Sequence, residues 1–429
     1  MGNFLYYVAV FIPVLSLLVF IHELGHFLLA KRAGILVREF AIGFGSKIFS
    51  WRRGETLYSI RLLPLGGYVR MAGEEPETVE VKAGAHVYAS LNELGKLDHM
   101  YLYEPNHSIG NIVAGRVVEV DLERKLYVVL ENDEGNEARY ELDPKMFLHF
   151  DEKSETQIAP WDRQFGSKTA GQKALAILAG PVFNIILTVV LFAIYIGITG
   201  VEHRLYVEKT VTGSPSATAG IQSGDIITKI NGKDVPTFDM FKYQILESQG
   251  SEVKLTVDRS GQQLEIPLQP EKKVTQSGDV IYQVGIDFNS EKGKRPATIG
   301  EIVSGGFTLT YDWIKVIGDG FYKLFTFQLS LENLGGPIQM GTITGQAAQQ
   351  GVDIVIKWMA ILSLNLGLFN LLPIPALDGS RLLFIGIEAL RGRPVSPNIE
   401  SMVHFVGFAL LMMLMLVVTY NDIVKLVFK

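Results

Sequence analysis

The stretch SLLVFIHELGHFLLAKRAG, residues 16–34, begins as an apolar run suited to a bilayer and then places His22, Glu23 and His26 within it. An ionisable side chain at membrane depth costs about 2.5–3.5 kcal/mol on insertion scales and commonly marks a functional site. His22 and His26 are four residues apart, so on a helix they share one face, about 40° apart around the axis. At that spacing both imidazoles can bind one Zn²⁺, with Glu23 beside them as a base for zinc-bound water. For each histidine alone, a packing or capping role is the alternative.

The composition favours a membrane protein. Hydrophobic residues make up 48% of the 429 residues, and the mean hydropathy is positive, which is unusual for a soluble enzyme. The net charge of −6 argues against a broad nucleic-acid-binding surface, and we expect no nucleic-acid partner. Because the chain has no cysteine, any metal must be bound by histidine and carboxylate side chains.

Four segments are apolar and long enough to cross a bilayer, which needs roughly 20 helical residues. The first has no basic residue before it and no small-residue cleavage site after it, so we expect an uncleaved span. The predicted organisation is a first transmembrane helix at 1–31, a cytoplasmic segment with a membrane-associated β-hairpin at 32–77, a soluble β-rich insert at 78–160, a second transmembrane helix at 172–199, a compact α/β module at 201–270, a linker and amphipathic helix at 271–352, a third transmembrane helix at 354–380 and a fourth at 402–426.

The segments between the spans have patterns of their own. Residues 55–74 alternate β-prone side chains around a Pro/Gly-rich centre, which predicts a β-hairpin near the membrane. Residues 307–336 carry aromatic side chains at helical spacing, broken by Gly318 and Gly320, which favours an interfacial amphipathic helix. A core helix of the α/β module is the alternative. Four histidines of the insert are too scattered to predict a metal site: His86, His99, His107 and His149.

Basic residues indicate the orientation. Eight Lys and Arg side chains follow the first span between residues 31 and 70, and none precedes it. Cytoplasmic loops are enriched in these residues, so we expect the N-terminus outside and the loop from Lys31 onward in the cytoplasm. The short loop between the third and fourth spans carries Arg381, Arg391 and Arg393, which agrees. The α/β module then lies outside.

A catalytic zinc site needs a third protein ligand and an open position for water. Asp378, at the end of the third span in NLLPIPALDGSR, offers a carboxylate. The first and third spans both run from outside to inside, so His26 and Asp378 are expected at the same cytoplasmic depth. His404 opens the fourth span without a companion polar cluster, and we expect an interfacial histidine there rather than a metal ligand.

The third span also contains Asn370, Pro373 and Pro375. The prolines prevent regular helix, and irregular backbone at this depth is tolerated only where protein encloses it or it lines a wet cavity. We therefore expect the chain to unwind before Asp378 and to present backbone groups to a substrate. Asn370 either orients a scissile peptide and its oxyanion or forms an interhelical hydrogen bond. AGPVFN in the second span predicts close helix packing that forms a wall of the site.

Taken together, HELGH in the first span, GPVFN in the second, AGIQSGD in the α/β module and NLLPIPALDG in the third resemble the site-2 intramembrane metalloproteases, in particular the bacterial RseP/RasP-like regulators. EFAIGFGSKIF and LLPLGGYVRMAGE resemble cytoplasmic stretches of that group, so the resemblance covers nearly the whole chain. It implies a multi-pass α-helical membrane protein with four transmembrane helices, an extracytoplasmic PDZ-like α/β domain and a cytoplasmic β-rich loop and insert.

The resemblance also implies roles for individual residues. Zn²⁺ is bound by His22, His26 and Asp378, and Glu23 is the catalytic acid/base. The loop around Tyr58–Met71 resembles a membrane-reentrant β-loop that pairs with an extended substrate strand. The substrate-binding residues expected from the resemblance are Asn370, Pro373, Pro375, Tyr58, Ile60, Leu62, Gly66, Gly67 and Tyr68.

The function implied is hydrolysis of peptide bonds in transmembrane segments of single-pass membrane proteins, such as anti-sigma factors and remnant signal peptides. An upstream site-1-type protease acts first on the same substrates. The protein is expected in the bacterial plasma membrane, with its active site near the cytoplasmic side. The chain departs from many relatives in having room for only one PDZ-like module and in its longer insert. A catalytically inactive PDZ-bearing scaffold and a metal transporter are the alternatives. The complete His/His/Glu/Asp set argues against the scaffold, and the scarcity of ionisable residues in the second and fourth spans argues against the transporter.

Overall fold

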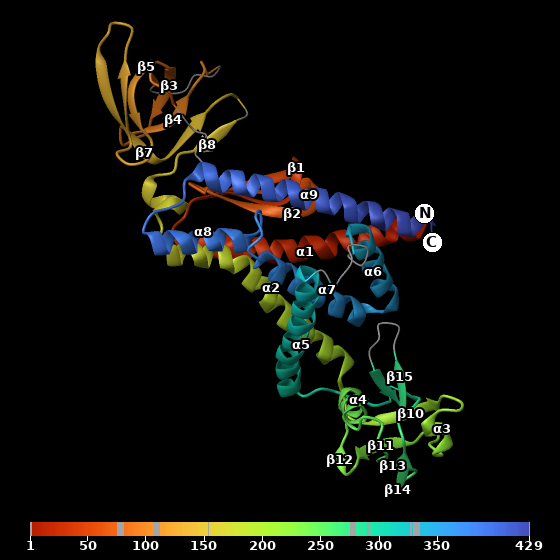
Figure 1. Cartoon of the computed structure of the whole chain (residues 1–429). Helices are drawn as coiled ribbons and strands as arrows, with labels where there is room; N and C mark the ends of the chain where they lie inside the picture. Colours follow the sequence, from red (N-terminus) through yellow and green to blue (C-terminus); the bar gives the residue numbers. More distant parts are fainter. Residues whose placement is uncertain are drawn as a thin grey trace. The chain divides into compact units, whose positions relative to one another are not determined.

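The computed structural model describes residues 2–74, 81–105, 112–152, 154–274, 280–289, 292–326, 328 and 335–428 (Figure 1). The chain divides into two compact units, Met1–Val189 with Thr310–Lys429, and Val190–Leu309. Two helices cross from one unit into the other, α2 (Ala170–Thr199) and α5 (Ile299–Phe325).

Long apolar helices dominate the first unit. Four helical segments among the described residues are long and apolar enough to cross a membrane: Leu5–Arg32, Ala170–Thr199, Val352–Asn370 and Asn398–Val424. These four apolar helices confirm the prediction of a multi-pass α-helical membrane protein. Besides parts of α2 and α5, the described α-helices of this unit are α1 (Gly2–Arg32), α6 (Pro337–Gln350), α7 (Val352–Asn370), α8 (Asp378–Arg391) and α9 (Pro397–Phe428).

The third apolar segment, predicted at 354–380, is interrupted before Asp378, as the prolines predict. Helix α7 ends at Asn370, residues 371–377 are not helical, and Asp378 is the first residue of α8. Pro373 cannot donate a backbone hydrogen bond and disfavours helix in the residue before it. Ala376 has a φ of 77°, which an α-helix does not allow. The carboxylate expected at the end of a span therefore lies at the start of a separate helix.

Of the eight strands in the described part of the first unit, six belong to the insert, and the other two form a sheet beside α1. The eight are β1 (Val37–Arg53), β2 (Thr56–Met71), β3 (His86–Leu91), β4 (Leu97–Tyr101), β5 (Ile112–Asp121), β6 (Tyr127–Glu131), β7 (Glu137–His149) and β8 (Glu155–Gln157).

Strand β2 pairs with β1, and this corrects the prediction of a hairpin within residues 55–74 alone. The chain reverses at Gly54, where φ is 61°, so nearly all of that stretch forms one strand. Phe40 of β1 has a β2 partner on each side, Tyr58 on one and Val69 on the other. Residues 58–60 run parallel to residues 40–42 and residues 67–69 run antiparallel to them, so the chain reverses within the Pro/Gly-rich centre of β2, but its two arms pair with β1 and not with each other.

The insert is a small closed barrel. Its strand order is β4-β3-β5-β6-β7-β8, and β4 also pairs with β7, so the sheet closes on itself. Its core contains Val87, Leu97 and Met100, none of which is exposed. Just after the barrel, Arg163 forms two hydrogen bonds of 2.6 Å with Glu55 at the β1–β2 turn. These bonds hold the pKa of Glu55 down to about 2 and join the segment after the barrel to the hairpin.

The second unit is an α/β module around a six-stranded sheet of order β14-β13-β11-β10-β17, with β12 paired to β11. Strand β17 pairs with β10, so the module extends beyond residue 270, where the local sequence pattern places its end. Its elements are β9 (Val201–Glu202), β10 (Leu205–Thr210), α3 (Pro215–Thr218), β11 (Ile226–Ile230), β12 (Lys233–Asp234), α4 (Phe238–Glu247), β13 (Val253–Arg259), β14 (Gln262–Leu268), β15 (Glu271–Val274), β16 (Val280–Gln283), β17 (Ile286–Phe288) and β18 (Lys294–Arg295).

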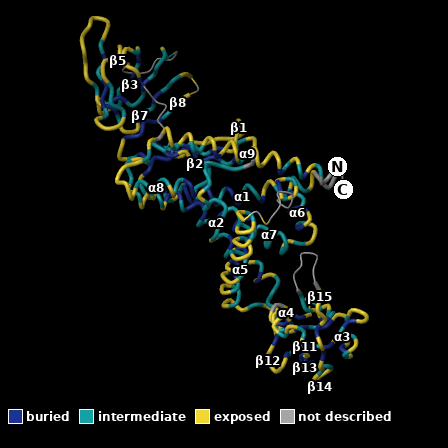
Figure 2. The backbone as a smooth tube through the Cα atoms, viewed as in Figure 1, coloured by how far each residue is buried: buried dark blue, intermediate teal, exposed yellow. Residues whose placement is uncertain are grey.

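Helix α5 is continuous and largely exposed (Figure 2). It runs through Gly318 and Gly320 without the break that the sequence pattern predicts. Phe307 and Tyr311 are 62% and 59% exposed. A core helix would bury these rings, so the exposure favours the interfacial interpretation over the core-helix alternative.

Candidate active site

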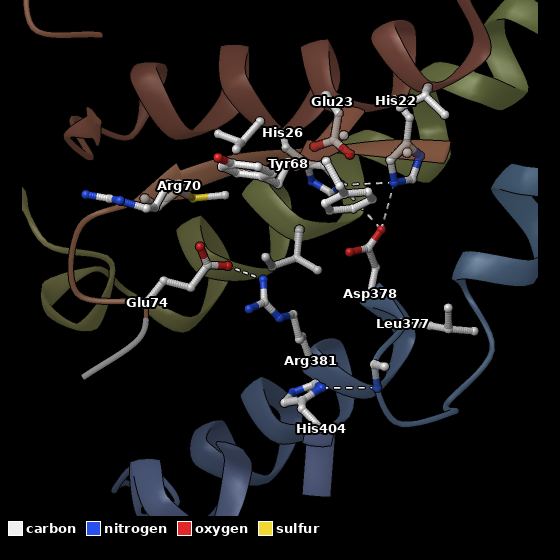
Figure 3. Close-up of a pocket in the computed structure, with 18 of the residues that line it drawn as sticks. His22, Glu23, His26, Tyr68, Arg70, Glu74, Leu377, Asp378, Arg381 and His404 are labelled. Carbon is white, nitrogen blue, oxygen red and sulfur yellow. Dashed lines mark hydrogen bonds and ion pairs between the residues drawn. The ribbon is translucent and has the colours of Figure 1, made fainter. Parts of the chain in front are cut away.

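Three predicted metal ligands meet between two helices (Figure 3). His22 and His26 project from α1, and Asp378 projects from the start of α8. Asp378 Oδ2 lies 3.1 Å from His22 Nε2 and 3.3 Å from His26 Nε2, and the two Nε2 atoms are 3.2 Å apart. Within the described part of the chain, this is the group of side chains whose ligand atoms converge closely enough to hold a metal ion.

The spacing of these three atoms fits Zn²⁺. In a tetrahedral site with zinc–ligand bonds of about 2.0–2.1 Å, neighbouring ligand atoms are about 3.3–3.4 Å apart. The separations of 3.1, 3.2 and 3.3 Å are close to that value. Two imidazoles and one carboxylate also form the ligand set of a catalytic zinc site, which keeps its fourth position open.

Helix α2 orients both imidazoles. His26 Nδ1–H donates to the Ala176 carbonyl at 2.9 Å, which leaves Nε2 free for a metal. The Asn184 amide lies 3.2 Å from His22 Nδ1, and Asn184 Oδ1 is buried without a hydrogen-bond partner. Turning the amide by 180° lets Oδ1 accept from His22 Nδ1–H, which satisfies this oxygen and frees His22 Nε2 as well. The motif AGPVFN by itself predicts only close packing, so the contact of Asn184 with His22 was not predicted.

Two glycines let other elements approach the site. A Cβ at Gly180 of α2 would lie 2.2 Å from His26 Nε2, and a Cβ at Gly67 of β2 would lie 2.9 Å from Glu23 Cγ. Real Cβ atoms essentially never approach a heavy atom that closely. Gly180 therefore forms the wall that AGPVFN predicts, and Gly67 brings β2 against Glu23.

Glu23 lies beside the cluster in a cavity of about 1220 Å³ (Figure 3). It is 8% exposed and follows His22 on α1, so the carboxylate and both imidazoles line the same space. A carboxylate there is placed to accept a proton from a water molecule bound next to the cluster.

Two ion pairs anchor α8, which carries Asp378. Lys173 Nζ of α2 lies 2.8 and 3.0 Å from the two oxygens of Glu388. Arg381 binds Glu74, which follows β2 (Figure 3). Each pair joins residues more than 200 positions apart, so no local sequence pattern indicates either of them.

Four of the predicted substrate-binding residues line the cavity: Asn370, Gly66, Gly67 and Tyr68. Asn370 lies at the last turn of α7, where its amide donates to the Leu366 carbonyl at 3.0 Å. That bond is within one helix, so the structure does not contain the interhelical bond that the sequence allows. The amide remains at the edge of the space that a substrate would occupy.

Five other predicted substrate-binding residues are not among those that line the cavity. Tyr58 packs against Phe40 and Trp51 in the hairpin. Ile60 and Leu62 are 43% and 60% exposed on the hairpin. The remaining two are Pro373 and Pro375, which lie in the break between α7 and α8.

The histidines outside the cluster do not join it. His404 Nδ1 accepts a hydrogen bond from the Ala376 N–H at 3.1 Å and is not a member of the metal-binding group. In the insert, His99 Nδ1 lies 2.9 Å from His149 Nε2, and the ring of His86 lies 5.1 Å from that of Tyr88 at an angle of 58°. His107 lies outside the described residues.

Comparison with known proteins identifies the family. The sequence profile of peptidase family M50 matches residues 10–414. The chain belongs to peptidase family M50. It is 46% identical to the zinc metalloprotease RasP of Geobacillus kaustophilus over 97% of both chains. It is 41% identical to the regulator of sigma-W protease RasP of Bacillus subtilis over 98% of both, and 36% identical to the probable protease eep of Enterococcus faecalis over 98% of this chain and 99% of that one.

The M50 assignment confirms the resemblance to site-2 metalloproteases and the prediction of an intramembrane metalloprotease. Among solved structures, the PDZ domain of the SdrC-like protein from Listeria monocytogenes is similar. It has 19% sequence identity and a TM-score of 0.19, and covers 22% of this chain and 97% of that one. A TM-score this low does not assign the fold of the second unit.

Proposed function

We propose that this M50 protease binds one Zn²⁺ through His22, His26 and Asp378 and uses Glu23 as its catalytic base. The observation that supports this most directly is the convergence of the three ligand atoms beside Glu23, at separations that a tetrahedral zinc site requires. When bound by these three residues, zinc would polarise the scissile carbonyl and lower the pKa of a water molecule to near neutral.

Glu23 accepts the proton of that water and delivers it to the leaving amine. Its carboxylate lies in the same cavity as the three ligands, and its burial keeps bulk water from competing for the proton. Replacement by glutamine keeps the size and hydrogen-bonding groups of the side chain but removes the basic oxygen. Glu23→Gln therefore separates proton transfer from metal binding.

We propose that the substrate enters as an extended strand between β2 and the break after α7. A helical segment hides its peptide groups in its own hydrogen bonds, so it must unwind before cleavage. Residues 67–71 pair with β1 along one edge, and the described residues provide no strand along the other. A substrate strand that adds to this edge would satisfy its exposed backbone groups close to Glu23. Asn370 lines the same cavity, and we propose that it hydrogen-bonds the same strand.

The proposed substrates are single-pass membrane proteins. One relative is named a regulator of sigma-W protease, which favours anti-sigma factors as substrates, with remnant signal peptides as a second group. We further propose that a site-1-type protease trims the outer part of the substrate first. The second unit, a PDZ-like module, would lie outside the bacterial plasma membrane, and the hairpin and insert would lie in the cytoplasm, because eight basic residues lie between positions 31 and 70, at the end of α1 and after it.

The test compares purified full-length wild type, Glu23→Gln and Asp378→Asn in detergent. The substrate is a tagged single-pass protein with a signal-peptide-derived apolar segment. We expect Glu23→Gln to retain about one zinc per chain while its cleavage rate falls at least about 100-fold, the lower range of general-base contributions. Asp378→Asn should lose zinc as well as activity. Glu252→Gln, an exposed substitution in the second unit, is the matched control. Full cleavage by the Glu23→Gln enzyme would contradict the role given to Glu23.

A further inference from the structure

The loop that leads to Asp378 contains a strained backbone position. Ala376 has a φ of 77°, in the left-handed region that side chains other than glycine seldom adopt. It lies two residues before Asp378, so a change of its φ would rotate the chain that carries the carboxylate. Such a conformation persists only where the surroundings hold it in place.

His404 of α9 holds this position. Its Nδ1 accepts a hydrogen bond from the Ala376 N–H at 3.1 Å (Figure 3). Its ring lies 5.8 Å from the ring of Phe384 on α8, so the same side chain contacts the loop and the helix that follows it. Three residues along α9, Gly407 permits close packing, because a Cβ there would lie 2.2 Å from Pro375 Cβ.

The other ring nitrogen of His404, Nε2, does not contact the loop. Nε2 is buried without a hydrogen-bond partner in the described structure, and Glu400 Oε1 lies 3.8 Å from it. The contact with the loop therefore depends on an acceptor at the Nδ1 position, one bond from Cγ. Asparagine places its side-chain oxygen at the same distance from Cγ, whereas glutamine places its oxygen where Nε2 lies.

We propose that His404 is a positioning residue of the protease: it holds Ala376 in its left-handed conformation and thereby keeps Asp378 against the paired imidazoles. This inference rests on the ligand role proposed above for Asp378. It gives a function to an ionisable side chain of α9 that the proposed zinc site and the cleavage chemistry do not use.

The test uses His404→Asn, His404→Gln and His404→Ala in the full-length enzyme, each alone and combined with Ala376→Gly. Zinc content is measured after dialysis against a chelator, and cleavage is measured on the tagged single-pass substrate, both per folded molecule from a monodisperse fraction. His203→Asn, on an exposed residue of the second unit, is the control for loss of a histidine.

We expect His404→Asn to stay within about threefold of wild type, while His404→Gln and His404→Ala lose about tenfold in cleavage and in zinc retention, the effect of one lost hydrogen bond. In the Ala376→Gly background the losses should shrink to about threefold, because glycine adopts a positive φ without assistance. Equal behaviour of the asparagine and glutamine variants, or losses that Ala376→Gly leaves unchanged, would overturn the proposal.

The same experiments distinguish a failure of this proposal from a failure of the proposed catalytic function. If wild type binds zinc, Glu23→Gln is inactive and all His404 variants behave like wild type, only the positioning role is wrong. If Glu23→Gln cleaves normally, the proposed chemistry is wrong, and zinc retention in the His404 variants still reports on the position of Asp378. If the glutamine variant does not fold, the comparison of His404→Ala with and without Ala376→Gly decides the outcome.

Discussion

Gly180→Ala is the sharpest test of the packing between α1 and α2. The substitution adds one methyl group, which would lie 2.2 Å from His26 Nε2, 2.6 Å from His26 Cε1 and 2.9 Å from His22 Cε1. The first distance is about 1.2 Å short of the 3.4 Å at which ordinary contact begins. Either α2 or the imidazoles must move by roughly that amount.

The expected loss of stability and the expected loss of rate can each be estimated. Overpacking of this kind destabilises a protein by about 1–3 kcal/mol. A displacement of about 1 Å in a reacting group costs on the order of 100-fold in rate. Because the methyl group pushes directly on two proposed zinc ligands, we expect cleavage to fall about 100-fold and zinc to dissociate more readily.

The assay measures zinc content after dialysis, cleavage of the single-pass substrate and thermal unfolding in detergent. Gly171→Ala is the matched control, because it lies on the same helix and its Cβ would have no neighbour within 4 Å. Alanine favours helix over glycine, so this control should be unchanged or slightly more stable. If Gly180→Ala binds zinc and cleaves as well as Gly171→Ala does, the close approach of α2 to the imidazoles is not a feature of the working enzyme.

Three further predictions concern side chains around the site and the hairpin. Asn184→Ala removes the group that orients His22 and should weaken zinc binding about 10–100-fold, measured by chelator competition. Lys173→Met leaves Glu388 without its cation and should lower both the unfolding temperature and zinc retention, whereas Lys173→Arg should preserve them. The pKa of Glu55 is lowered from 4.5 to about 2, so its ionised form contributes stability above pH 4.5 that is lost as the pH falls toward 2. Glu55→Gln should therefore flatten the acid side of a plot of unfolding temperature against pH.

The residues of the metal cluster could be predicted because their signals are local or follow from membrane topology. His22, Glu23 and His26 are close in sequence, and their spacing matches the helical period. Asp378 could be predicted as a ligand from the membrane orientation of the spans, since two spans that run in the same direction bring their cytoplasmic ends to one depth. The structure places all three ligands together, although it moves Asp378 from the end of a span to the start of α8.

The partners of these residues could not be predicted in the same way. The sequence indicated only a packing role for Asn184, because its contact with the His22 ring forms only when α2 packs against α1. The pairing of β2 with β1 in two registers depends on contacts that the alternation within residues 55–74 does not encode. Likewise, β17 joins the second unit through an edge of β10 that lies about eighty residues earlier in the chain.

The sequence by itself determined the candidate metal-binding and catalytic residues, the apolar helices and the protease family, because hydrophobic length, helical period and the ordered motifs are properties of short segments. Only the tertiary structure decided which atoms approach His22 and His26, how α8 is anchored, and that His404 supports the loop before Asp378. Those relations depend on side chains that are distant in sequence and are brought together by packing, and the strain at Ala376 depends on the loop geometry that this packing imposes.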